Sequence, residues 1–166
     1  MPKLAERPPE ATPPPEAAAS QEADFYRWTQ EQAALLRAGR WSALDRDALA
    51  EEIADLGGSQ KSGIRSRLTV LLHHLLKWEF QPQRRKYGWR ATIIEQRVGL
   101  ADIVEMSPSL GRWPAEALAR AYRLARVRAV EETGLPEQTF PTTCPYALER
   151  ILDDGFYPGT EERDVV

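Results

Sequence analysis

The sequence predicts an all-α fold, a single-domain bundle of five or six helices that follows a disordered N-terminal tail. Apolar residues recur every three or four positions through most of the chain, and no window alternates in the way a strand does. Glycines and prolines divide this pattern into segments of helical length. The chain has 166 residues, of which 42% are hydrophobic, so it can bury a core. Its one cysteine, Cys144, excludes a fold held by intramolecular disulfides.

The predicted tail covers residues 1–22. Residues 1–20 hold 6 of the 13 prolines and no aromatic residue, so they cannot bury enough apolar surface to offset the entropy lost on ordering. The predicted folded domain covers residues 23–158. Residues 159–166 are polar and predict a frayed C-terminus.

Caps and breakers delimit the helices within the domain. Asp24 is a suitable N-cap for a first helix that runs to residue 38 and stops at Gly39. Gly57 and Gly58 separate a second helix from a third, and Pro82 ends the third. Pro114 suits the first turn of a fifth helix, which ends before Gly134. The expected spans after the first helix are 45–56, 59–80, 89–105, 114–133 and a short helix over 145–154.

The net charge of −3 conceals a basic middle segment. Residues 61–97 carry nine basic and two acidic groups, whereas acidic groups predominate on both sides of that segment. The densest basic run is the linker Arg84-Arg85-Lys86, followed by Tyr87 and Trp89, and such a run can bind phosphates and stack bases. A solvated charge run beside core aromatics is the competing interpretation, and a pI near 5.5 disfavours general nucleic-acid binding.

Four polar residues fall at the edges of predicted apolar helix faces, Glu52, Arg67, His74 and Arg97, and a fifth, Gln96, lies inside such a face. Buried polar groups must pair with one another, so one interpretation is a structural network in which Glu52 neutralises a buried arginine. The other is a pocket in which Arg67 and Arg97 hold an anion and His74 transfers protons. The helical wheel places His73 on the solvent side. Because adjacent helical residues diverge by about 100°, His73 and His74 do not suit one metal ion, and no metal or cofactor site is predicted.

The residues from Asp24 to Pro158 resemble a bacterial family, Domain of Unknown Function 29. The resemblance rests on several stretches of this sequence: Asp24-Phe25-Tyr26-Arg27-Trp28, Leu49-Ala50-Glu51-Glu52-Ile53, Leu75-Leu76-Lys77-Trp78, Glu95-Gln96-Arg97, Glu131-Glu132-Thr133-Gly134-Leu135-Pro136 and Cys144-Pro145-Tyr146. It implies an all-helical domain and no particular activity. A second and shorter likeness is the spacing of Arg67 to His73 or His74, which resembles the Arg…His motif of HEPN-type helical ribonucleases.

Two functions follow as hypotheses. The first is a non-enzymatic, cytoplasmic protein-interaction module, because the sequence contains no recognisable catalytic constellation, secretory signal or membrane span. A protein partner is expected, a homodimer is compatible with this hypothesis, and nucleic acid is a disfavoured partner. The alternative is a HEPN-like ribonuclease or nucleotide-handling enzyme that uses Arg67 and His74.

Overall fold

The computed structural model describes residues 20–160, and within them the all-α prediction is confirmed. Five α-helices occur there and no strand does. Most of the predicted tail, residues 1–19, and residues 161–166 of the predicted frayed C-terminus lie outside the described residues. Ser20 begins a hydrogen-bonded turn, since its carbonyl accepts from the amides of Ala23 and Asp24. The chain divides into two compact units, residues 1–53 and 54–166.

The first unit contains helix α1, Phe25–Arg37, and a 3₁₀ turn, Trp41–Ala43. The Asp24 side chain accepts a hydrogen bond from the Arg27 amide at 3.0 Å, and Gly39 has a φ of 67°, so the predicted cap and stop are confirmed. Trp28 and Gln32 are the buried side chains of α1. Gln32 accepts a hydrogen bond from the Asp45 amide at 2.9 Å, which joins α1 to the start of the next helix.

Helix α2 spans Arg46–Phe80 without interruption, so the predicted break at Gly57 and Gly58 is wrong. Neither glycine has a positive φ, which is the conformation that ends a helix at glycine. A glycine inside a helix costs about 1 kcal/mol relative to alanine, and that cost alone does not stop a helix that is otherwise well formed. Ile53 and Leu56, in the N-terminal half of α2, are 69% and 72% exposed.

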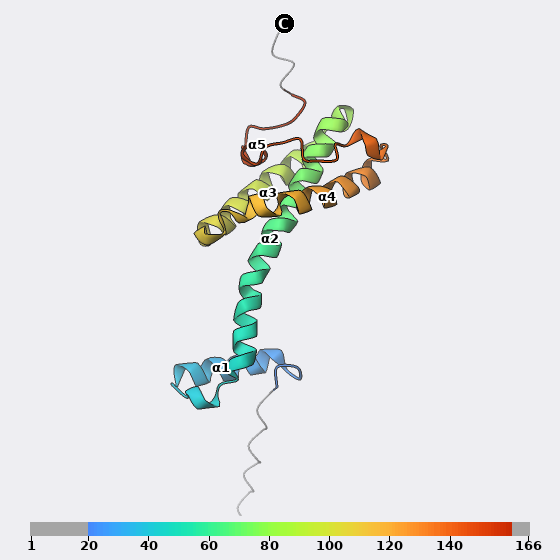
Figure 1. Cartoon of the computed structure of the whole chain (residues 1–166). Helices are drawn as coiled ribbons and strands as arrows, with labels where there is room; N and C mark the ends of the chain where they lie inside the picture. Colours follow the sequence, from blue (N-terminus) through green and yellow to red (C-terminus); the bar gives the residue numbers. More distant parts are fainter. Residues whose placement is uncertain (1–19, 161–166) are drawn as a thin grey trace, which may run out of the picture. The chain divides into compact units, whose positions relative to one another are not determined.

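The second unit is built on the C-terminal half of α2. Helix α3, Tyr87–Met106, and helix α4, Trp113–Thr133, both lie against that half (Figure 1). Pro114 lies in the first turn of α4, and Gly134 ends the helix with a φ of 68°, as predicted. Helix α5 is shorter than predicted and spans Leu148–Leu152. The remaining 3₁₀ turns are Pro82–Arg84, Pro108–Leu110 and Glu137–Thr139.

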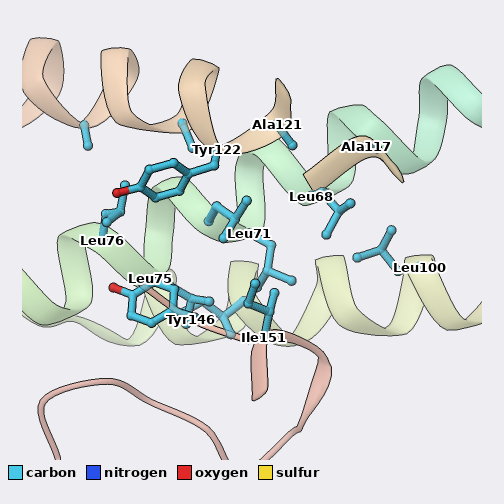
Figure 2. Packing of buried hydrophobic residues seen from close by; sticks show 14 of the residues in the cluster. Leu68, Leu71, Leu75, Leu76, Leu100, Ala117, Ala121, Tyr122, Tyr146 and Ile151 are labelled. Atoms are coloured by element: carbon cyan, nitrogen blue, oxygen red, sulfur yellow. The ribbon is translucent and has the colours of Figure 1, made fainter. Parts of the chain in front are cut away.

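The core of the second unit joins all four of these helices. Figure 2 shows leucines of α2 between α4 on one side and α3 and α5 on the other. Helix α4 contributes a row of buried alanines at four-residue spacing, which lets its backbone approach α2 closely. The fully buried residues include Leu68, Leu71, Leu75 and Leu76 of α2, Ala121, Ala125 and Ala129 of α4, and Ile151 of α5.

Two α4 side chains hold the irregular chain that follows α4. Tyr122 donates its hydroxyl to the Pro141 carbonyl at 2.7 Å. Arg126 donates to the carbonyls of Phe140 and Glu137, each at 3.0 Å. These two side chains thus donate hydrogen bonds to carbonyls that have no backbone donor within a helix. None of the helices within residues 20–160 combines the length and the apolar character of a membrane span.

The continuity of α2 predicts that alanine at both Gly57 and Gly58 stabilises the protein. A Cβ at either position meets nothing within 4 Å, and alanine gains about 1 kcal/mol per site in a helix interior. Gly134→Ala is the matched control, because its positive φ makes alanine strained there, with a loss of about 1 kcal/mol. Urea unfolding followed by circular dichroism measures both effects. A loss of helicity in the Gly57→Ala, Gly58→Ala variant contradicts a continuous α2.

Candidate functional site

The polar cluster of the second unit consists of His73 and Lys77 on α2 and Glu132 on α4. Lys77 is 2% exposed and donates to Glu132 Oε1 at 2.6 Å. The Lys77 ammonium also lies 4.5 Å from the centre of the Trp89 ring of α3. His73 Nε2 is 2.9 Å from Glu132 Oε2 but is not aligned for a hydrogen bond. The cluster therefore ties α2, α3 and α4 together through one ion pair and one cation–π contact.

The two histidines differ in what surrounds them. Burial, with the nearby Lys77 charge as the next cause, lowers the pKa of His73 from 6.5 to about 4. Burial also lowers the pKa of His74, whose Nδ1 lies 2.9 Å from the Val70 carbonyl. Both imidazoles are therefore neutral at pH 7. The prediction that His73 faces solvent is wrong, because α4 covers that side of α2 and leaves His73 only 8% exposed.

Glu132 keeps its negative charge at neutral pH. Burial raises its pKa, but the hydrogen bond and the charge of Lys77 outweigh burial, so its pKa lies below the ordinary value. The residues that sequence reasoning missed here are Lys77 and Glu132. Lys77 lies four positions after His73, so the two share a helix face, which was the available signal. The partner carboxylate on α4 is 55 residues from Lys77, and no local pattern connects them.

Arg67 and Gln96 lie together between α2 and α3. Arg67 Nη1 donates to Gln96 Oε1 at 3.3 Å across α2 and α3. The guanidinium occupies the space beside Gly99, where a Cβ would lie only 2.3 Å from Nη1. Gly99 thus leaves room for Arg67 in the α2–α3 seam.

Arg97 is a structural residue that holds the C-terminal segment of the second unit. It is 3% exposed, and its guanidinium donates to the carbonyls of Ile151, Asp154 and Phe156 at 2.9, 3.3 and 2.7 Å. Its guanidinium carbon lies 5.4 Å from the centre of the Tyr157 ring. Burial lowers the pKa of Arg97, yet a guanidinium remains charged at neutral pH.

Glu52 does not join the network that the sequence predicted. It accepts a hydrogen bond from Gln21 within the first unit, and no ion pair connects it to an arginine of residues 20–160. The prediction required a turn after residue 56 to bring a second helix back along the third, and α2 has no such turn. Among the five predicted seam residues, all of them in the described part of the chain, only Arg67 and Gln96 bond to each other directly.

The basic linker splits into one structural and two exposed cations. Arg85 donates Nε to the Trp78 carbonyl at 2.8 Å and Nη2 to the carbonyls of Pro158 and Gly159, both at 3.3 Å. Its guanidinium carbon is 5.2 Å from the centre of the Trp78 ring. Arg84 and Lys86 are exposed, as a solvated charge run predicts, whereas Arg85 is half-buried.

A cavity of about 320 Å³ opens at the junction of α2 and α3. We name it the basic corner; its lining residues are Trp78, Arg85, Lys86, Tyr87 and Arg90. Three of these carry positive charge, two are aromatic and none is acidic. This combination suits an anion that also carries an aromatic group.

Cys144 lies at a different cavity, of about 390 Å³, beside Tyr122 and Thr143. Burial raises the pKa of the Cys144 thiol, which therefore stays protonated at neutral pH and is a poor nucleophile. Among residues 20–160, no group of three or more His, Cys, Asp or Glu side chains is arranged to hold a metal ion.

Arg67 and His74, the residues of the ribonuclease hypothesis, line neither the basic corner nor the cavity at Cys144. Arg67 bonds to Gln96, and His74 Nδ1 lies within bonding distance of a backbone carbonyl. No observation on these two residues favours a shared reaction site.

The buried lysine predicts that Glu132→Gln destabilises the protein. The substitution leaves the Lys77 charge without a compensating carboxylate, at a cost of about 2 kcal/mol or more. Glu131→Gln, one residue away and exposed, is the matched control and changes the free energy of unfolding by less than about 0.5 kcal/mol. Adding Lys77→Met to Glu132→Gln restores most of the lost free energy of unfolding. Equal melting temperatures for the two single variants would falsify the role of this ion pair.

The buried imidazole predicts a pH dependence of stability. The pKa of His73 is about 4 in the folded protein and near 6.5 in the unfolded chain, so the unfolded chain binds the proton more tightly. Stability is complete above pH 6.5 and falls as the pH drops toward 4, with a slope of up to about 1.4 kcal/mol per pH unit. Urea unfolding at pH 7, 6 and 5 measures the slope, and His73→Gln reduces it. An NMR titration that places the His73 pKa near 6.5 contradicts this prediction.

A family model described as a domain of unknown function, DUF29, matches residues 21–157. The match covers α1 to α5 and confirms the resemblance noted in the sequence. No curated protein and no solved structure matches the chain. The chain therefore belongs to the DUF29 family, whose function is unknown.

Proposed function

We propose that this chain is a non-enzymatic protein-interaction module and that its first unit associates with the first unit of a second copy. The observation that carries the proposal is the small hydrophobic core of this unit. Within residues 20–53, Trp28 is the one large apolar side chain that is buried. A unit of 53 residues is only marginally stable by itself, because small domains bury a smaller share of their surface on folding, so association stabilises it.

The first unit exposes the apolar surface that such an association requires. Five large apolar side chains within residues 20–53 are exposed: Phe25 50%, Tyr26 74%, Leu36 42%, Trp41 64% and Ile53 69%. Together they present on the order of 500 Å² of apolar surface, taking about 150–250 Å² for each aromatic side chain. A standard interface buries about 800 Å² per partner, and rather more than half of it is apolar. The exposed apolar area is thus close to what one side of a stable dimer uses.

A second copy fits this surface better than an unrelated partner does. In an isologous dimer the same surface occurs on both sides, so apolar side chains meet apolar side chains without a further complementary feature. The described residues of the first unit carry four arginines and seven acidic groups interspersed, so both signs of charge are available for cross-dimer pairs. A second copy of the chain therefore supplies both the apolar surface and the charges that this interface requires.

Light scattering coupled to size-exclusion chromatography tests the proposal on the full chain. We expect a dimer at about 50 µM that dissociates on dilution. Ile53→Gln removes exposed apolar surface from the first unit and weakens the dimer at least tenfold. Val127→Gln is the matched control, because Val127 is also exposed on a helix, at 63%, but belongs to the second unit.

Two results overturn the proposal. The first is a monomer at every concentration up to about 500 µM. The second is equal weakening by Ile53→Gln and Val127→Gln, which places the contact outside the first unit. Circular dichroism of each variant verifies that the helices are retained.

A further inference from the structure

The basic corner is a second feature of the fold, independent of the first unit. It forms where α2 ends, the Pro82 turn reverses the chain and α3 begins. Lys86 is the N-cap residue of α3, and the first turn of that helix contains no acidic residue and no side-chain cap. The positive end of the α3 dipole therefore adds to the side-chain charges around the cavity.

The three cations of the basic corner are not equivalent. Arg85 is held by three backbone carbonyls, so it forms part of the wall. Lys86 and Arg90 lie on exposed positions, and within residues 20–160 no carboxylate lies within 4.0 Å of either. Each instead lies near an aromatic ring, Lys86 at 5.7 Å from the Trp89 centre and Arg90 at 5.5 Å from the Tyr157 centre. These two cations retain their capacity to pair with an anion from solution.

The aromatic walls point to a ligand that is more than a bare anion. Trp78 is half-buried beside the cavity, and its Nε1 is buried without a hydrogen-bond partner among the described residues. Tyr87 is 91% exposed at the same cavity, although tyrosine normally buries most of its ring. An aromatic group bound against Tyr87 and the part of Trp78 that lines the cavity would cover surface that the fold leaves in water.

The volume of the cavity and the negative charge of the rest of the chain favour a small molecule as the ligand. A cavity of about 320 Å³ lies at the lower end of small-molecule sites. The remainder of the chain is acidic enough to give a pI near 5.5, so a long polyanion meets repulsion beyond the corner. A cavity of this volume holds one phosphate and one ring system.

We propose that the basic corner binds a small aromatic phosphate ester of the size of a nucleoside monophosphate. Lys86 and Arg90 hold the phosphate, and the ring system lies against Trp78 and Tyr87. Arg85 positions the Trp78 ring and the chain at Pro158 and Gly159. Binding is reversible and requires no covalent step.

Calorimetric titration of the full chain with adenosine 5′-monophosphate tests the site, with adenosine and inorganic phosphate as separate probes. We expect the monophosphate to bind at least tenfold more tightly than either part alone, because only the intact molecule uses both the cations and the rings. Lys86→Ala and Arg90→Gln each weaken binding at least fivefold, and Tyr87→Ala weakens it by a similar factor. Binding also weakens as salt is raised from 50 to 300 mM.

Arg84→Ala is the matched control, since Arg84 is an exposed cation of the same linker that does not line the cavity. It leaves the affinity unchanged within a factor of two, and the melting temperatures of all four variants stay close to that of the unaltered chain. An equal loss for Arg84→Ala and Lys86→Ala indicates diffuse charge attraction and overturns the proposal. Phosphate that binds as tightly as the monophosphate overturns the role of the rings.

Two further arms complete the test. Residues 161 and 162 are glutamates that follow Thr160, so the titration is repeated with Glu161→Gln and Glu162→Gln combined. Binding of the monophosphate to either form supports the site, provided that Arg90→Gln abolishes it. Absence of binding at 5 mM in both forms overturns the proposal. A ten-nucleotide single-stranded DNA that binds more than tenfold tighter than the monophosphate overturns the assignment to a small ligand.

Discussion

The buried guanidinium of Arg97 is the interaction on which the second unit depends. The chain after α4 contains little regular structure, so its carbonyls need donors from elsewhere. Arg97 supplies three hydrogen bonds to this segment from the middle of α3, and the planar guanidinium can do so from one buried position. Its placement fixes Ile151 in the core and Tyr157 beside the basic corner.

Two other arginines of the second unit also donate hydrogen bonds to backbone carbonyls of irregular chain. Arg126 holds the carbonyls of residues 137 and 140, and Arg85 holds those of residues 158 and 159. Each arginine projects from a helix or its flanking turn to a stretch of irregular chain. Charges that the sequence groups into a basic segment thus serve partly as internal hydrogen-bond donors. What remains for an external anion is the smaller set at the basic corner, Lys86 and Arg90.

The two units differ in the interactions that stabilise them. The second unit places leucines of α2 against the alanines of α4, so backbones approach closely and the core is continuous. The first unit has one buried tryptophan and a glutamine that bonds to the backbone at residue 45. The proposed association of the first unit and the proposed ligand binding at the basic corner therefore rest on separate parts of the molecule. Either can be lost without the other.

Helix type, caps and most helix ends follow from the sequence by itself, because Asp24, Pro82, Pro114 and Gly134 act on the backbone within one turn of their own position. The continuity of α2 does not, since a glycine costs a helix only about 1 kcal/mol and does not by itself decide whether the helix stops. The pairing of Lys77 with Glu132 and the burial of His73 were decided by the tertiary structure alone. Both depend on α4 lying over one particular face of α2, and no residue spacing encodes which face a distant helix covers.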